Sequence, residues 1–261
     1  MKLFDTRVLF SGLLAMLVAV GAQAGVKEKK VMLPDGLGSG VLYLSDKKAA
    51  KGPAVVVVHE WWGLNDYARQ RAKMLAEAGY SAIAVDMYGT GKVADHPKDA
   101  TAFMNAALAE PEKMNARFDA AMAILKDQKG VQVDQLYAIG YCFGGAVVLN
   151  QARRGVDLAG VASFHGSLAT ENPAKAGEVK AEVLVATGGA DPMVPAEQVA
   201  AVTGEMAAAG VKLTVLNFPQ AKHSFTNPGA TAVGEKYGMP LAYDEGADKE
   251  SWAALMNMLA K

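Results

Sequence analysis

The chain of 261 residues contains one cysteine, Cys142, and no run of basic residues. A single cysteine cannot form a disulfide within the chain, so this thiol is either a small buried side chain or is kept for its reactivity. The formal net charge is only −1 at pH 7. A chain so close to neutrality, without a basic cluster, is not expected to bind nucleic acid or an anionic membrane surface.

The N-terminus has the pattern of an export signal. Lys2 and Arg7 precede the apolar run "VLFSGLLAMLVAV", and the small residues "AQA" end at Ala24. This pattern predicts a signal peptide over residues 1–24, cut after Ala24, and a periplasmic or secreted product. The alternative is an uncleaved anchor, but the run is short for a membrane span, and the mature protein is expected to have none. No cysteine follows the cut, which excludes lipid attachment there.

Residues 25–261 predict one α/β domain, since about 240 residues suit a single large domain. Short apolar runs such as "PAVVVVHE" and "YSAIAVDMYG" alternate with amphipathic stretches such as "NDYARQRAKMLAEAG", for which Asn65 is the expected N-cap and Gly79 the stop. Strands that are apolar throughout and separated by helices predict a mostly parallel sheet with helices on both faces. Two antiparallel strands are expected before Pro53, and a monomer is favoured.

The segment "GYCFG", residues 140–144, matches the G-x-S-x-G nucleophile elbow with cysteine in place of serine. The elbow is a tight strand-to-helix turn, and its glycines let neighbouring backbones approach. The positive end of the following helix favours a thiolate. Cys142 is therefore the candidate nucleophile, and the amide of Phe143 is a candidate oxyanion donor. The alternative is a turn with a small buried cysteine.

A thiol nucleophile needs a base, and the base needs an orienting acid. In this architecture the chain order is nucleophile, acid, histidine. His223 follows the last clear strand and is the predicted base, whereas His59, His96 and His165 precede the expected acid. Asp191, in "GGADPMVP" after a strand, is that acid. Asp86 precedes the nucleophile and is assigned a structural role.

The segment "VVVVHEWWG" ends a strand at His59 and Glu60. The H-E-x-x-H zinc motif is absent, because Gly63 stands four residues after His59, and no metal or cofactor is expected. The loop after this strand is in the position that supplies the second oxyanion donor in this architecture. The amide of Trp61 is the candidate for that donor. Trp61 and Trp62 are either a pocket wall or core.

The combination of "HEWWGLND", "YSAIAVDMYG", "GYCFGG", "GGADPMVP" and "KHSF" resembles the dienelactone hydrolase family of α/β-hydrolases. The resemblance implies a compact hydrolase without a cofactor, with a triad of Cys142, His223 and Asp191. It also implies that Glu60 interacts with the resting cysteine and is displaced when substrate binds.

Two positions depart from the family pattern. Well-studied members hold a substrate carboxylate with arginines, but this chain has Asn227 beyond the histidine and "GTGKVADHP" after the "D-x-Y" segment. Lys92 could supply one charge there, although only as a point charge without a planar fork. A carboxylated lactone is therefore an uncertain substrate, and export adds to that uncertainty.

The sequence thus predicts a thiol-dependent hydrolase of a small ester or lactone that works through an acyl-enzyme. The alternatives are a general carboxylesterase, an acyl hydrolase of polymer fragments, a non-catalytic ligand-binding protein on the same scaffold, and a redox-sensing thiol. The last is weakened by the absence of a second cysteine.

Overall fold

The computed structural model describes residues 25–45 and 52–261, so the predicted signal peptide lies outside the described residues. In these residues one sheet has the strand order β1-β2-β4-β3-β5-β6-β7-β8. Its strands are β1 (Val26–Leu33), β2 (Gly38–Ser45), β3 (Gly52–Val58), β4 (Ser81–Val85), β5 (Val131–Tyr141), β6 (Gly160–Phe164), β7 (Glu182–Gly188) and β8 (Leu213–Phe218).

The strands from β3 onward are parallel, and only β1 and β2 run antiparallel to their neighbours. The predicted opening antiparallel pair and the predicted parallel sheet are both confirmed. A short 3-10 turn, Pro34–Gly36, joins β1 to β2. The carboxyl ends of the parallel strands meet at one edge of the sheet, where loops from all of them can contribute to a single site.

The helices described are α1 (Asp66–Ala78), α2 (Pro97–Leu108), α3 (Pro111–Lys126), α4 (Phe143–Arg153), α5 (Ala196–Ala208), α6 (Ala230–Tyr237) and α7 (Glu245–Leu259). As predicted, α1 is capped by the Asn65 side chain and ends at Gly79, whose φ is +112°. Pro111 divides the long helical stretch into α2 and α3, because proline is favoured at a first helical position but breaks a helix interior.

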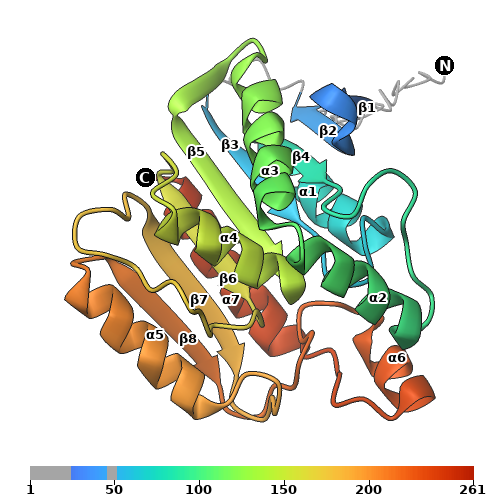
Figure 1. Ribbon diagram of the computed structural model, residues 1–261, viewed down its shortest axis with the longest axis vertical. Helices are drawn as coiled ribbons and strands as arrows, with labels where there is room; N and C mark the ends of the chain where they lie inside the picture. The colour runs from blue at the N-terminus through green and yellow to red at the C-terminus, as the bar shows by residue number, and fades with distance from the viewer. Residues whose placement is uncertain (1–24, 46–51) are drawn as a thin grey trace, which may run out of the picture.

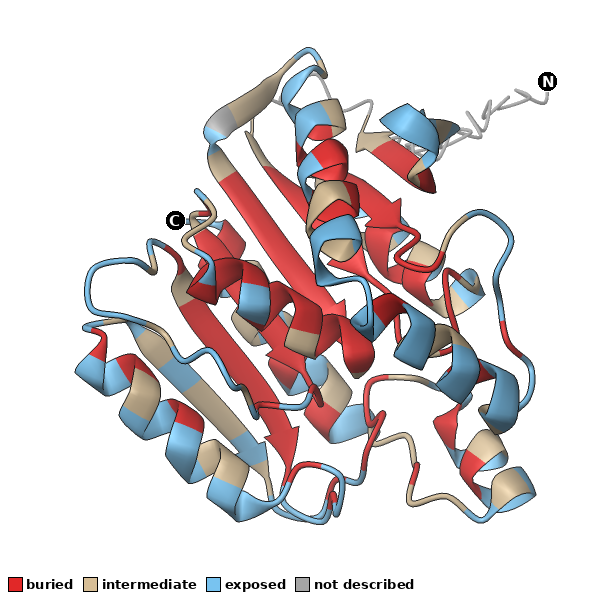
Figure 2. Ribbon diagram, viewed as in Figure 1, coloured by how far each residue is buried: buried red, intermediate tan, exposed pale blue. Residues whose placement is uncertain are grey.

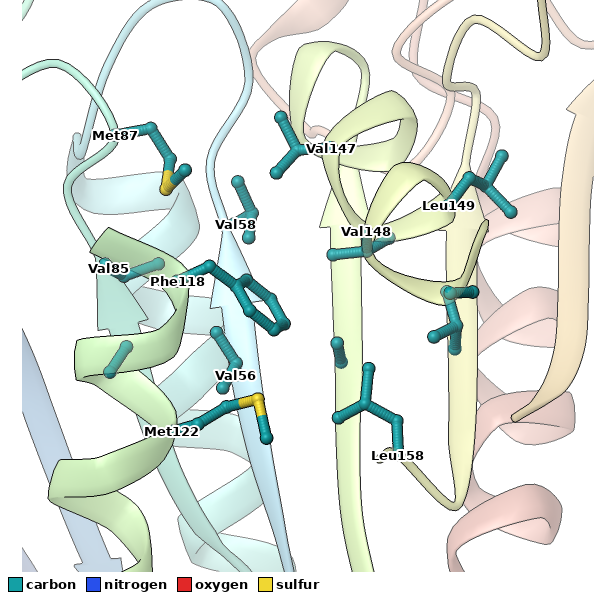
Figure 3. Packing of buried hydrophobic residues seen from close by; sticks show 14 of the residues in the cluster. Val56, Val58, Val85, Met87, Phe118, Met122, Val147, Val148, Leu149 and Leu158 are labelled. Carbon is teal, nitrogen blue, oxygen red and sulfur yellow. The ribbon is translucent and has the colours of Figure 1, made fainter. Parts of the chain in front are cut away.

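Helices cover both faces of the sheet (Figure 1). On one face α3 and α4 pack on β3 and β5, and Figure 3 shows Phe118 and Met122 against Val56 and Val58. On the other face α1 and α7 cover Val55 and Val57. The consecutive valines of β3 are therefore buried on both sides, and Figure 2 shows the central strands buried over most of their length, although the start of β5 is more exposed.

Within the described ranges, no helix combines the length and the apolar character that crossing a membrane would require.

Candidate active site

Cys142 lies at the junction of β5 and α4, at the carboxyl edge of the sheet. Its backbone has φ +53° and ψ −115°, a conformation that non-glycine residues rarely adopt. The Cys142 amide donates to the Phe164 carbonyl of β6 at 3.0 Å. The side chain is partly exposed and stands at the N-cap of α4, so the positive end of that helix faces it.

Two glycines make this turn sterically feasible. A Cβ on Gly140 would lie 2.0 Å from the Gly144 carbonyl oxygen, and one on Gly144 would lie 2.4 Å from the Val58 carbonyl oxygen. The Gly144 amide donates to the His59 carbonyl at 3.1 Å, which joins the start of α4 to the loop after β3. The glycines predicted for a strained elbow are thus required by backbone packing.

His223 and Asp191 form a buried pair. His223 Nδ1 donates to Asp191 Oδ2 at 2.7 Å, and the other carboxylate oxygen accepts from the Met193 amide at 2.8 Å. The paired glycines before Asp191 let its loop approach the segment that leads to His223. A Cβ on Gly188 would lie 2.3 Å from the Ala221 carbonyl oxygen.

Cys142 and His223 interact through charge. Burial lowers the pKa of His223, but the charge of Cys142 and the hydrogen bond to Asp191 outweigh it and raise this pKa to about 10. Nε2 of His223 forms no hydrogen bond of ordinary geometry to a described residue. Such contacts are often long or poorly aligned in enzymes without bound substrate. The structure thus brings together the three residues that the sequence predicted for a triad.

Two backbone amides near the start of α4 are without an acceptor among the described residues. Those of Trp61 and Phe143 donate no hydrogen bond to any protein group among the described residues. The Trp61 amide lies in the loop after β3 and the Phe143 amide at the start of α4, and the hydrogen bond from the Gly144 amide to the His59 carbonyl joins these two segments. Free amides on adjoining segments next to a nucleophile are what an oxyanion hole requires.

The Glu60 carboxylate is buried and held by neutral donors. The Ser224 hydroxyl donates to Oε1 at 2.7 Å, and the Asn227 amide donates to Oε2 at 2.7 Å. Burial raises the pKa of Glu60, and these two hydrogen bonds oppose the rise. The contacts described do not include a hydrogen bond from Glu60 to Cys142, which the family resemblance implied for the resting enzyme. Here Glu60 instead anchors the segment that follows His223.

His59 and Asp86 have structural contacts. His59 Nε2 accepts from the Met87 amide at 3.1 Å, so its proton is on Nδ1, which donates to the Glu60 carbonyl at 2.5 Å. Burial lowers the pKa of His59 to about 4, although the bond to Glu60 acts in the opposite direction. Asp86 accepts from the amides of Tyr88 and Gly89. Neither residue serves as the acid or base of the site.

The two tryptophans differ in exposure. Trp62 is buried in a small apolar cluster with Ala94 and Ala100, whereas Trp61 is only partly buried beside it. Core packing therefore describes Trp62, and Trp61 is left as the pocket-wall candidate. Lys92 is exposed.

The sequence analysis missed Tyr88, which packs on His59 and Phe143 and donates to the Trp61 carbonyl at 3.1 Å. Burial and the charge of Cys142 both raise the pKa of Tyr88. Its place in "DMYG", directly after a buried strand, was the available signal.

The arginines of the described residues are all engaged. Each forms an ion pair or donates to a backbone carbonyl: Arg69 with Asp66, Arg71 with Asp248, Arg117 with the Leu37 and Met87 carbonyls, Arg153 with Glu205, and Arg154 with Asp119. None of these side chains is available as a free guanidinium for a substrate carboxylate.

A cleft of about 1160 Å³ runs between α3, α4 and the segment 169–178. Phe143 lines it, but Cys142, Asp191 and His223 do not. The cleft is thus lined by the neighbour of the candidate nucleophile but not by the candidate triad. Within the described residues, no group of His, Cys, Asp and Glu side chains could hold a metal ion.

Comparison with known proteins identifies a family. The model of the dienelactone hydrolase family matches residues 39–261. A protein of Salmonella typhimurium named "Putative carboxymethylenebutenolidase" is 25% identical over 233 residues, which cover 84% of this chain and 82% of the relative.

Solved structures agree with this match. One named m3DLH is 36% identical, with a TM-score of 0.82, and covers 90% of this chain and 98% of its own. A dienelactone hydrolase-like promiscuous phosphotriesterase from metagenomic libraries is 35% identical, with the same TM-score and coverage. A putative dienelactone hydrolase from Klebsiella pneumoniae, 22% identical with a TM-score of 0.72, shares the fold. The chain therefore belongs to the dienelactone hydrolase family, with an α/β-hydrolase fold, and is a hydrolase that acts on ester bonds.

Proposed function

We propose that this protein hydrolyses small uncharged carboxylic esters or lactones through Cys142. The observation that carries the proposal is the position of the only thiol, on a strained turn at a helix N-terminus and beside a buried His223–Asp191 pair whose imidazole pKa it raises. A thiolate next to an imidazolium is the reactive form of a cysteine nucleophile.

The reaction has two steps. The Cys142 thiolate attacks the carbonyl carbon, and the amides of Trp61 and Phe143 stabilise the oxyanion. Protonated His223 gives its proton to the leaving oxygen as the carbon–oxygen bond breaks, which leaves a thioester. Neutral His223 then takes a proton from water, whose oxygen attacks the thioester and releases the acid. Asp191 keeps the imidazole oriented throughout.

An uncharged substrate is favoured by the electrostatics of the site. The described arginines are engaged elsewhere, and Glu60 is held by the neutral donors Ser224 and Asn227. An added carboxylate would approach a buried acidic group, and the cations near that group, His223 and Arg71, are already paired with Asp191 and Asp248. We expect an aryl acetate to be hydrolysed with a higher kcat/KM than the matched aryl ester whose acyl chain ends in a carboxylate. A preference for the carboxylated ester would contradict this part of the proposal.

Hydrolysis of p-nitrophenyl acetate tests the nucleophile. The wild-type protein is expected to release p-nitrophenol and to gain one acetyl group on Cys142 when an acid-quenched sample is examined by mass spectrometry. Cys142→Ala is expected to lose the activity while its circular dichroism spectrum is unchanged. Ser251→Ala serves as the control, since this buried hydroxyl bonds only within α7. Full activity of Cys142→Ala would refute the assignment.

A second candidate activity is phosphotriester hydrolysis. It is suggested by the solved structure at 35% identity that is described as a promiscuous phosphotriesterase. The same thiolate would attack phosphorus and displace an aryloxide, and water would then cleave the sulfur–phosphorus bond. Turnover of paraoxon that disappears in Cys142→Ala would support this activity, and no turnover above buffer would exclude it.

We also propose that residues 1–24 act as a signal peptide and that the protein functions in the periplasm or outside the cell. The support is the sequence pattern of Lys2, Arg7, the apolar run and "AQA" before Gly25.

A further inference from the structure

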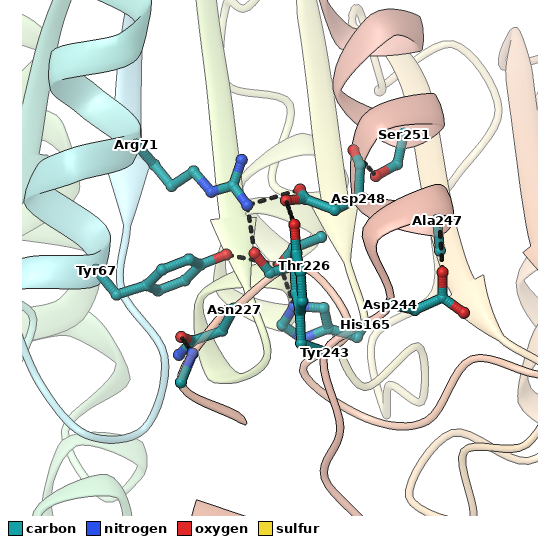
Figure 4. A network of polar contacts seen from close by, with 11 residues as sticks. Tyr67, Arg71, His165, Thr226, Asn227, Tyr243, Asp244, Ala247, Asp248 and Ser251 are labelled. Atoms are coloured by element: carbon teal, nitrogen blue, oxygen red, sulfur yellow. Dashed lines mark hydrogen bonds and ion pairs between the residues drawn. The ribbon is translucent and has the colours of Figure 1, made fainter. Parts of the chain in front are cut away.

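The segment after His223 is held by a buried polar network that the proposed reaction does not use directly. Thr226 stands at its centre and is 1% exposed. Its hydroxyl lies 2.6 Å from the Tyr67 hydroxyl and 2.7 Å from His165 Nε2 (Figure 4). One threonine side chain thus joins α1 to the loop after β6.

The backbone of Thr226 is fixed as well. Its carbonyl accepts from the buried Arg71 guanidinium, which also contacts Asp248 of α7 at 2.6 Å. Arg71 lies over the rings of Tyr67 and Trp252, at 5.3 and 5.4 Å from their centroids. Because α1 holds its hydroxyl and its carbonyl, and the loop after β6 also holds the hydroxyl, Thr226 is a fixed point three residues from the candidate base.

His165 joins this fixed point to His223. Its ring is fully buried, bonds to Thr226, and meets the His223 ring edge to face with a centroid distance of 5.2 Å. Its backbone adopts φ +41°, and its amide donates to the Ala186 carbonyl at 2.8 Å. A non-glycine residue adopts this conformation only where its surroundings hold it there.

The His165 ring is neutral. Burial lowers its pKa well below the usual value, and the positive charge of His223 lowers it further. A neutral ring can lie against the imidazolium of His223 without like-charge repulsion. An apolar ring would fill the same space, but it would leave the Thr226 hydroxyl with only Tyr67 as its partner.

We infer that His165 is a positioning residue for His223. The Thr226 hydroxyl fixes the His165 ring, and this ring supports the His223 imidazole in the orientation that directs Nε2 toward Cys142. This inference rests on the proposed function, because it assigns His223 the role of base. A purely structural role would affect stability alone, whereas a positioning role affects the chemical step and the interaction between His223 and Cys142.

The first test compares Thr226→Val, which removes the hydroxyl at nearly constant shape, with Thr226→Ser, which retains it. With p-nitrophenyl acetate, Thr226→Val is expected to lower kcat by about tenfold or more and to leave KM within about twofold, since small displacements of a catalytic group reduce the rate strongly. Thr226→Ser is expected to restore most of kcat. Ser251→Ala controls for loss of a buried hydroxyl that bonds only the backbone of α7 and touches neither Thr226 nor His165.

The second test does not depend on turnover. In protein labelled with ¹⁵N-histidine, NMR titration is expected to give a His223 pKa near 10 in the wild type. In Thr226→Val this pKa is expected to fall toward the ordinary value, because a misoriented ring loses its contacts with Cys142 and Asp191. Thr226→Ser is expected to remain near the wild type.

The outcomes separate the inference from the proposed function. A normal kcat and a normal His223 pKa in folded Thr226→Val, with an active wild type, would overturn the inference and leave the function intact. Full activity of Cys142→Ala would overturn the function itself. If Thr226→Val does not fold, His165→Phe is the deciding variant. It keeps a ring against His223 but cannot form the hydrogen bond to the Thr226 hydroxyl. A wild-type kcat in His165→Phe would also overturn the inference.

Discussion

At the scale of single residues, the backbone of Cys142 is the most constrained feature of the site. Its left-handed φ of +53° is compatible with the fold only because Gly140 and Gly144 allow carbonyl groups within 2.4 Å of where their Cβ atoms would be. The strain presents the thiol at the edge of the sheet, above the start of α4. Packing around the two glycines therefore determines where the sulfur lies.

Gly144→Ala is expected to disrupt the elbow, because the new Cβ meets the backbone of β3 and no flexible side chain can yield. We expect a loss of several kcal/mol in the free energy of unfolding, as for overpacked sites, together with loss of esterase activity. Gly204→Ala in α5 is the matched control. Nothing lies within 4 Å of its Cβ, and it is expected to stabilise the protein by about 0.5–1 kcal/mol. Urea denaturation measures the free energy of unfolding of both variants. Equal changes in Gly144→Ala and Gly204→Ala would show that the close contact at Gly144 does not matter.

His59 is expected to make the stability of the folded protein fall as the pH falls. Its folded pKa of about 4 lies below the ordinary value of 6.5, so the unfolded chain binds more protons between these pH values. Stability from neutral His59 is complete above pH 6.5 and is lost as the pH falls toward 4. His59→Asn is expected to be less stable at pH 7, but the deficit should shrink by roughly 3 kcal/mol by pH 4. A deficit that stays constant in urea denaturation across this range would exclude the effect.

The sequence predicted Cys142, Asp191 and His223 because each follows a recognisable strand in the chain order of this architecture, and the structure brings the three together. The roles of Thr226 and His165 could not be predicted. They depend on the approach of α1 and β6 to the segment after β8, and no local pattern encodes that approach.

At the scale of elements, α1 and α7 meet through one buried ion pair. Arg71 and Asp248 lie 2.6 Å apart with side-chain exposures of 5% and 13%. Both helices cover the same face of the sheet, and the pair fixes their relative position behind the His223 segment. Removal of one partner leaves the other charge buried without compensation.

Arg71→Met is accordingly expected to lower the free energy of unfolding by about 3–5 kcal/mol. Adding Asp248→Leu is expected to cost less than the sum of the two single changes, since the uncompensated carboxylate is then removed. Urea denaturation of the two single variants and the double variant measures this coupling. Strict additivity would show that the pair does not act as a unit.

The helix α6 was not predicted, whereas α1 was expected from its amphipathic pattern, its Asn65 cap and its terminal Gly79. It spans eight residues, has no side-chain N-cap and contains Gly234 in its interior. A Cβ on Gly234 would lie 2.4 Å from the Leu241 carbonyl oxygen. The glycine that weakens the helical pattern is thus required by a tertiary contact, which is why a local pattern does not reveal this helix.

At the scale of the whole molecule, the first strand described begins directly after the predicted cleavage site. β1 starts at Val26 and pairs with β2 along its full length, from Val26 opposite Ser45 to Leu33 opposite Gly38. β1 forms one edge of the sheet, and the family match begins at residue 39, within β2.

A protein that starts at Gly25 is expected to fold and to have the kcat/KM of the exported product. N-terminal sequencing of that product should begin at Gly25. A protein that starts at Ser39 lacks β1 and exposes the edge of β2, so it is expected to aggregate more readily. An exported product that retains Met1 would refute the cleavage, and an inactive protein from Gly25 would show that the first 24 residues contribute to the fold.

The anchoring of the His223 segment also sets when the site can form during synthesis. His223 pairs with Leu241, and the Thr226 anchor Arg71 contacts Asp248, so this segment has its full support only when the last helix has docked. Cys142 precedes α7 by about a hundred residues, so it leaves the ribosome well before that helix does. The elbow can fold at that stage, but the imidazole is not yet fixed beside it. Hydrolytic competence is therefore expected only after α7 has left the ribosome and docked.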